Sequence, residues 1–170
     1  MNIKAALLKE HSKEQKDRIV NYIGGNQKLF DELMVLFFEG PYRVTQRSAW
    51  VMSYCIDNHP LLIQPHFDKL AANLRTTELD AVKRNILRNL QNIEIPERLV
   101  GEVTDICFKI IATNQEPIAI KAFSMTVLYN ITLRIPVLQH ELKLRIEDLL
   151  PYASPGIKSR GKKILKKLSK

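Results

Sequence analysis

Histidine and cysteine side chains are the first candidates for metal binding or nucleophilic catalysis in this 170-residue chain. His59 and His66 stand seven residues apart with two prolines between them, whereas two histidines that bind zinc from one helix face follow the HExxH spacing. Cys55 and Cys107 lie among apolar residues, which is typical of buried cysteines that act as small hydrophobic side chains. We therefore predict no metal site, no cofactor and no catalytic residue.

The aromatic side chains that could stack on a planar ligand are Trp50, the single tryptophan, and Tyr54, one helical turn later. A lone tryptophan at helical spacing is more often part of a core, so a core and a groove interpretation both stay open. No Gly-x-x-x-x-Gly-Lys-Ser/Thr motif occurs, and no phosphate-binding loop is predicted.

The basic residues are unevenly distributed along the chain. There are 26 Lys and Arg against 18 Asp and Glu, a formal net charge of +8. From residue 158 onward there are seven bases and no acid, namely Lys158, Arg160, Lys162, Lys163, Lys166, Lys167 and Lys170. The rest of the chain is close to neutral, and the excess of positive charge favours anionic partners.

Neither a membrane span nor a targeting segment is evident. The longest uncharged stretch, residues 122–133, has 12 residues, whereas a spanning helix needs about 20 apolar residues. Only four consecutive apolar side chains precede Lys9, which is too few for a signal peptide. We expect a cytoplasmic protein without a membrane partner.

The elements that would position the side chains are helices. Apolar residues recur at helical spacing, and one such face consists of Leu99, Val103, Ile106, Cys107 and Ile110. Strand signals are weak, because no run alternates apolar and polar residues and no Asn-Gly or Asp-Gly turn occurs. Prolines separate the helices by short breaks, as expected for antiparallel neighbours. The sequence predicts an all-α fold.

Three of the predicted helices repeat one pattern. Residues 82–93, 120–131 and 157–168 each begin with an apolar residue and Lys, with Leu seven residues and another apolar residue ten residues after that Lys. The copies are offset by 38 and 37 residues, and residues 44–56 form a weaker fourth copy with Arg47 at the basic position. Another amphipathic helix precedes each copy. The chain is thus predicted to consist of repeating helix pairs.

The predicted organisation is one repeat domain over residues 1–170. Residues 1–27 form an N-terminal helical cap, with Ser12 as the N-cap of a helix over 13–23. Four helix pairs follow, over residues 28–56, 60–93, 96–133 and 136–170. One pair cannot bury its apolar faces alone, so stacked pairs would form a continuous core between polar end units.

The paired pattern resembles HEAT repeats over residues 28–168. The first helix of such a repeat has apolar residues around a proline, here Leu-Leu-Ile-Gln-Pro at 61–65. The second helix begins Val-Arg-x-x-Ala-x-x-x-Leu, and its first two positions match Val82-Lys83, Ile120-Lys121 and Ile157-Lys158. The resemblance implies an armadillo-type α-α superhelix, a right-handed solenoid of about four helix pairs.

Two details of the resemblance are specific to this chain. The family's small residue three places after the base is Ser124 or Gly161 in two copies, but Ile86 and Trp50 stand there in the others. The run Arg-Ser-Ala-Trp at 47–50 resembles a group of short bacterial HEAT-like proteins, some of which are labelled adenylosuccinate lyase. The lyase loop Met-Pro-x-Lys-x-Asn is missing, because none of the four methionines precedes a proline, so that activity is not expected.

The resemblance also implies that the second helix of each pair lines a concave face. Residues 43–56, 81–93, 118–133 and 157–170 together have 13 bases and no acid, whereas the first helices have more acids than bases. We predict a basic concave face that binds a partner through Arg47, Lys83, Arg84, Arg88, Lys121, Lys158 and Lys162.

The predicted function is a non-catalytic HEAT-like binding module or scaffold with an acidic partner, a protein segment or nucleic acid. One alternative is a protein-protein scaffold in which the charge is incidental: consensus bases can tie neighbouring repeats together, and a Lys-rich last helix can act as a solubility cap. The other is a HEAT-like DNA glycosylase acting on alkylated bases, with Trp50, Arg47 and Arg84 in its groove and a carboxylate from Asp57 or Asp80.

Overall fold

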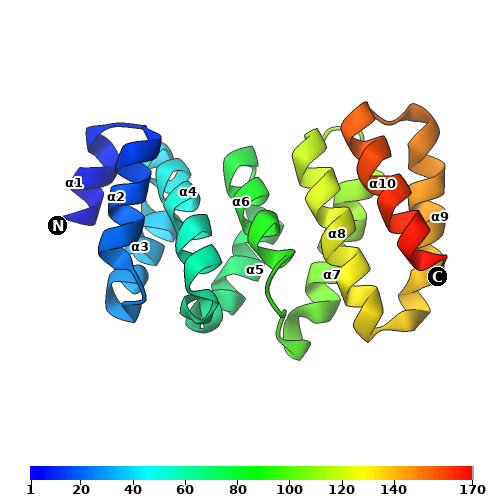
Figure 1. Ribbon diagram of the computed structural model, residues 1–170, viewed down its shortest axis with the longest axis horizontal. Coiled ribbons are helices and arrows are strands. Elements are labelled where there is room, and N and C mark those ends of the chain that lie inside the picture. The colour runs from blue at the N-terminus through cyan, green and yellow to red at the C-terminus, as the bar shows by residue number, and fades with distance from the viewer. Residues whose placement is uncertain (170) are drawn as a thin grey trace. The chain divides into compact units, whose positions relative to one another are not determined.

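The computed structural model describes residues 1–169 and consists of helices joined by short turns (Figure 1). The α-helices are α1 (Ile3–Lys9), α2 (Lys13–Ile23), α3 (Gln27–Glu39), α4 (Tyr42–Asn58), α5 (Phe67–Thr76), α6 (Asp80–Leu90), α7 (Glu97–Ala112), α8 (Ile118–Arg134), α9 (Gln139–Leu149) and α10 (Pro155–Leu168). Three 3-10 helices join them: η1 (Pro60–His66), η2 (Pro136–Leu138) and η3 (Leu150–Tyr152). No strand occurs among the described residues, and the predicted all-α helical repeat fold is confirmed.

The chain divides into two compact units, Met1–Asn89 and Leu90–Lys170. The first contains α1 to α5 and all but the last residue of α6, and the second contains α7 to α10. Turns separate the two helices of each predicted pair, at Gly40-Pro41, 77–79, 113–117 and 153–154. A single domain over residues 1–170 stays a prediction.

In the first unit α3 packs against α4, and α1 and α2 both contact α4 (Figure 1). The apolar face that the spacing predicts for α3 is fully buried, and consists of Phe30, Leu33, Met34 and Phe37. Burying each side chain of this size stabilises the folded state by roughly 1.5–3 kcal/mol. The N-terminal helices therefore complete the core of the first helix pair.

The boundaries of α2 follow from its caps. The Ser12 hydroxyl accepts a hydrogen bond from the Gln15 backbone N–H (3.1 Å) and donates one to the Glu10 carboxylate. The helix ends at Gly24, whose φ of +49° favours glycine because other residues have a Cβ that disfavours this conformation. The helix predicted over 13–23 is confirmed.

The second pair begins differently from the predicted single amphipathic helix. Its first turns form η1, and the α-helix α5 begins only at Phe67. Pro65 explains the difference, because proline lacks a backbone N–H and its ring clashes with the preceding helical turn. The freed carbonyl oxygen of Leu62 accepts a hydrogen bond from Gln27 Nε2 (3.0 Å), which fixes η1 against α3.

In the second unit α7 packs against α8, and α10 packs against both α8 and α9 (Figure 1). The predicted face of α7 is buried over its whole length, at Leu99, Val103, Ile106, Cys107 and Ile110. At Gly161 an added Cβ would lie 3.0 Å from Ile146 Cγ2 and 2.9 Å from Leu150 Cδ2. Glycine at this repeat position therefore lets the basic helix α10 approach its neighbour closely.

The helix bounds correct one expectation about charge. The second helices were expected to contain no acid, but α4 extends to Asn58 and includes Asp57, and α6 begins at Asp80. Both acids lie at helix ends, where turns had been expected. Only α8 and α10 are second helices without an acid among the described residues.

Candidate functional site

Two of the predicted binding residues, Arg47 and Arg88, tie helices of the first unit together. Arg47 Nη1 donates a hydrogen bond to the Leu7 carbonyl oxygen (2.6 Å), which links α4 to α1. Arg88 donates from Nη1 to Ser53 Oγ (2.6 Å) and from Nη2 to Asp57 Oδ2 (2.5 Å), which links α6 to α4. Both side chains are half-buried. Their guanidinium groups therefore have structural contacts of the kind expected if the basic positions join neighbouring repeats.

Trp50 and Tyr54 meet around the buried side chain of Lys16, which is 4% exposed. Lys16 Nζ lies 3.3 Å from the Tyr54 ring centroid and 5.7 Å from the Trp50 ring centroid, and pairs with the Asp17 carboxylate. These are favourable cation–π geometries. The His11 ring covers Trp50 from 5.0 Å. Trp50 and Tyr54 are both half-buried. Their burial is therefore intermediate between the core and the groove interpretations.

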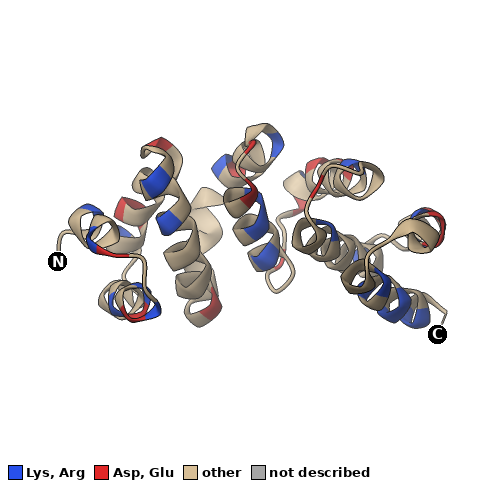
Figure 2. Cartoon of the chain, turned by 90° about the horizontal axis from the view of Figure 1, so that it is seen from above, with Lys and Arg blue, Asp and Glu red and all other residues tan. Residues whose placement is uncertain are grey.

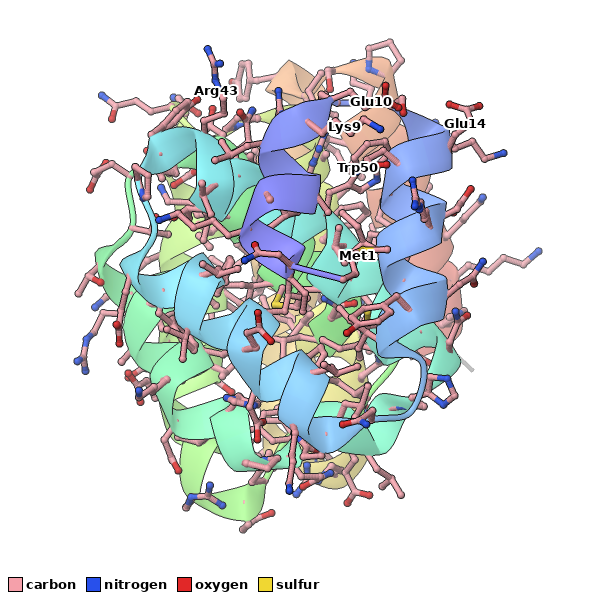
Figure 3. All side chains as sticks on the ribbon, turned by 90° about the vertical axis from the view of Figure 1, so that its left-hand side faces the viewer. Met1, Lys9, Glu10, Glu14, Arg43 and Trp50 are labelled. Atoms are coloured by element: carbon pink, nitrogen blue, oxygen red, sulfur yellow. The ribbon has the colours of Figure 1, made fainter. Side chains whose placement is uncertain are left out.

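The surroundings of Trp50 leave little room for a ligand. In the view of Figure 3, Trp50 lies below Lys9 and Glu10, between the ribbons of α1 and α2. The cavity lined by Trp50, His11 and Arg47 has a volume of about 10 Å³, roughly the space of one water molecule.

Of the two carboxylates considered for base excision, Asp57 accepts the Arg88 hydrogen bond and Asp80 is exposed at the first residue of α6. No observation supports the glycosylase alternative.

The remaining predicted bases of α6 and α8 differ in exposure. Arg84 is exposed, and Lys83 is half-buried with interacting neighbours. Lys121, on α8, is only 4% exposed. Burial lowers the pKa of Lys121, and the nearby Glu116 carboxylate acts in the opposite direction. Lys121 therefore offers little of its charge to a partner in solution.

The last helix, α10, has more exposed bases than any other helix of the second unit. Figure 2 shows Lys and Arg along this helix as far as the C end. Of the predicted binding residues, Lys158 is half-buried and Lys162 is exposed. Lys163, Lys166 and Lys167 are exposed as well. No Asp or Glu occurs in the described part of this helix, so its positive potential is not neutralised from within.

A cleft of about 450 Å³ opens between α8 and α10, which makes it a site of ligand size. Its lining residues are Thr126, Tyr129, Asn130, Arg160, Lys163, Ile164, Lys166 and Lys167, none of which is acidic. Lys167 Nζ lies 5.0 Å from the centroid of the Tyr129 ring. The cleft thus combines exposed ammonium groups with one half-buried aromatic face.

The polar floor of this cleft is held in place by hydrogen bonds within the second unit. Asn130 Nδ2 donates to the Gln91 carbonyl oxygen (2.8 Å). Arg160 Nη1 donates to Gln91 Oε1 (3.1 Å) and to the Thr126 hydroxyl. Because these side chains are already oriented, binding a ligand would cost little additional entropy in the side chains of the cleft.

The lysines that line the cleft were not among the predicted binding residues. Lys158 was predicted because it occupies the consensus basic position of the repeat, and Lys162 lies one turn further on the same helix face. Arg160, Lys163 and Lys167 follow a second helical spacing that faces α8, and this spacing was visible in the sequence. Tyr129 could not be predicted as a binding residue from the sequence, because only the packing of α10 on α8 brings it beside these bases.

The two cysteine thiols are the remaining candidates for nucleophilic chemistry among the described residues. Cys55 and Cys107 are buried, as predicted, and burial raises the pKa of each thiol to about 12. A thiolate nucleophile is therefore scarce at neutral pH.

Among residues 1–169 no group of three or more His, Cys, Asp or Glu side chains could hold a metal ion. Over the same residues no helix is both long and apolar enough to cross a membrane.

Comparison with known proteins gives one positive result. A family model described as a HEAT repeat domain matches residues 3–168. No curated protein matches the chain, and no solved structure does. The matched range includes the two helices of the N-terminal cap, which precede the region where the sequence resembled the repeat.

Proposed function

The chain belongs to the HEAT repeat family, a family of helical scaffolds that commonly mediate macromolecular interactions, and on that premise we propose that it is a non-catalytic binding module for an acidic macromolecule. The proposed binding residues lie on the second helices of the pairs, and α10 of the second unit is the main contributor. The predicted cytoplasmic location and the absence of a membrane partner stay predictions.

The observation that carries the proposal is the charge of α10. This helix has exposed lysines at 162, 163, 166 and 167 and no acid among its described residues. The neighbouring helix α9 offers a contrast, because Lys143 and Arg145 there pair with Glu147 and Glu141 four residues away. Unneutralised charge of one sign attracts and retains a partner of opposite charge.

The two arginines that tie helices contribute less to this surface. Arg47 and Arg88 use their N–H groups on Leu7, Ser53 and Asp57. Replacing either residue would therefore change stability more than binding. The predicted residues that keep the binding role in this proposal are Arg84, Lys158 and Lys162. The half-buried Lys83 has a supporting role, and the buried Lys121 contributes little.

The test is binding of fluorescein-labelled anionic probes, an oligoglutamate peptide and an oligonucleotide, followed by anisotropy as salt is raised from about 20 mM. We expect binding of at least one probe, with an affinity that falls as salt increases. The double substitution Lys158→Gln/Lys162→Gln should weaken that binding about fivefold or more.

The matched control removes two positive charges from α9 by Lys143→Gln/Arg145→Gln, and should change the affinity less than twofold because those charges are already paired. An equal loss in both variants would indicate a non-specific charge effect. Absence of binding to both probes at about 20 mM salt would contradict the proposal and favour a scaffold in which the charge is incidental.

A further inference from the structure

We propose that the cleft between α8 and α10 is a binding site for single-stranded nucleic acid, in which the lysines of α10 contact backbone phosphates and one unstacked base lies against Tyr129. This inference rests on the proposed function and names the class of acidic partner. The cleft and its residues lie wholly within the second unit.

The first argument is the position of the charges. Lys163 and Lys167 are one helical turn apart on α10, so their Cα atoms are separated by about 6 Å along the helix axis. Lys166 lies beside them, and all three side chains are exposed. A row of ammonium groups along one side of a cleft without an acidic lining residue is suited to a chain of regularly spaced phosphates.

The second argument is the aromatic face within the same cleft. The Tyr129 ring is half-buried and has Lys167 Nζ 5.0 Å from its centroid. The face of an aromatic ring carries partial negative charge, so a carboxylate of an acidic peptide gains nothing from stacking on it. A nucleobase does gain, because every base has a π-face that stacks on an aromatic side chain. The pairing of lysines with Tyr129 therefore favours nucleic acid over an acidic peptide.

The third argument is the prepared shape of the cleft. Arg160 and Asn130 are held by Gln91 and Thr126, so the polar floor keeps its geometry without a ligand. A volume of about 450 Å³ is of the size that holds small organic ligands, and the cleft is open at the surface, so a longer strand can continue beyond it. A duplex hides the faces of its bases, and would use the lysines without using Tyr129.

The experiment measures anisotropy of a fluorescein-labelled oligothymidylate, the matching duplex and an oligoglutamate peptide with the full chain. Tyr129→Leu removes the ring but keeps an apolar side chain of similar length, whereas Tyr129→Phe keeps the ring. We expect Tyr129→Leu to weaken single-strand binding by about fivefold or more, and Tyr129→Phe to bind within twofold of the unaltered chain. Far-UV circular dichroism verifies that each variant is folded.

The phosphate contacts are tested by Lys163→Gln/Lys167→Gln. We expect the negative slope of log K against log salt to become shallower by about 1.4 for two lost phosphate contacts on a single strand. Tyr129→Leu should leave that slope unchanged, since the ring neutralises no phosphate. The α9 double variant Lys143→Gln/Arg145→Gln controls for net charge and should leave both the affinity and the slope close to their original values.

The outcomes separate this inference from the proposed function. Binding that depends on the α10 lysines but is unaffected by Tyr129→Leu, or that is as tight for the duplex or the peptide, overturns the single-strand site and leaves the acidic-partner proposal standing. Failure of all three probes to bind overturns both. Only single-strand preference together with loss on Tyr129→Leu and retention on Tyr129→Phe supports the site.

Discussion

At the scale of single residues, the basic side chains separate into two groups that the sequence could not distinguish. Arg47 and Lys162 were predicted to serve one surface, but Arg47 donates to the Leu7 carbonyl oxygen whereas Lys162 is exposed. Helical spacing places a residue on a face, but it does not say which polar atoms of a neighbouring helix lie within reach. Lys16 shows the same limit, because a lysine in an amphipathic helix gave no reason to expect burial beside Tyr54.

The two thiols give a residue-scale prediction with a definite sign. Burial raises the pKa of Cys55 and Cys107 from an unfolded value of 9.0 to about 12. Thiol burial therefore contributes fully to stability below about pH 9, and this contribution is lost as the pH rises from 9 towards 12, because the unfolded chain releases its thiol protons first. We expect the free energy of unfolding in urea to fall between pH 8 and pH 10, by about 1 kcal/mol for each thiol.

A Cys55→Ala/Cys107→Ala variant serves as the reference, since it has the same lysines and tyrosines but no thiol. Its stability should fall less over the same pH range. Ellman's reagent at pH 8 should also react slowly with the folded chain and rapidly with both thiols in denaturant. Rapid reaction of either thiol in the folded chain would show that the side chain is accessible and would contradict its burial.

At the scale of elements, hydrogen bonds connect residues that are separated by nearly the repeat length. Arg88 reaches Ser53 over 35 residues. Arg134 Nη1 reaches the Ile95 carbonyl oxygen (2.7 Å) and Asn130 reaches Gln91, each over 39 residues. The Arg88 bond fixes α6 to α4 of the preceding pair, as expected where repeats contact their neighbours. The other two bonds hold α8 to the segment between α6 and α7.

Helix existence and pairing could be predicted from the sequence because they depend on local spacing and on prolines. The starting position of α2 could also be predicted, since Ser12 stands directly before the amphipathic run. The 3-10 geometry of η1 and the cleft beside Tyr129 could not, because the first depends on how Pro65 is accommodated and the second on the packing of α10 against α8. The lysines of the cleft could be read from the sequence, but the direction in which their helix face points depends on the same packing.

The N-caps of α2 and α10 provide a prediction at this scale. Ser12→Ala removes an acceptor for the Gln15 N–H and should lower the free energy of unfolding by about 1 kcal/mol. Ser154 occupies the same position before α10, but its buried Oγ has no hydrogen-bond partner among the described residues. Ser154→Ala should therefore leave stability unchanged or raise it slightly.

Urea denaturation of the two variants, followed by circular dichroism, measures both effects under one condition. The comparison is matched, because the same substitution is made at the same helix position. A loss at Ser154 as large as the loss at Ser12 would show that the Ser154 hydroxyl caps α10 after all. It would then be wrong to treat the start of the basic helix as uncapped.

At the scale of the whole molecule, the family match runs without a break from residue 3 to residue 168, while the structure divides into units at residues 89 and 90. The division falls at the end of α6. Because helices in a repeat array bury their faces against their neighbours, we propose that the chain folds as the single domain that the sequence predicts. In that case the two units lose their structure together.

Trp50, the single tryptophan, makes this proposal testable, because it lies in the first unit and its fluorescence reports on that unit alone. Far-UV circular dichroism reports on the helices of both units. We expect urea transitions measured by the two signals to coincide in midpoint and in slope. Leu142→Ala, a fully buried position of α9 in the second unit, should cost about 2–5 kcal/mol.

The decisive measurement is the Trp50 transition in the Leu142→Ala variant. If the chain is one cooperative domain, destabilising the second unit must shift the fluorescence midpoint of the first unit to lower urea, as Leu33→Ala in the first unit does directly. If the units fold independently, the fluorescence midpoint stays where it was and only part of the dichroism signal moves. That result would replace the single domain with two, and α7 to α10 would then carry the basic cleft as an autonomous unit.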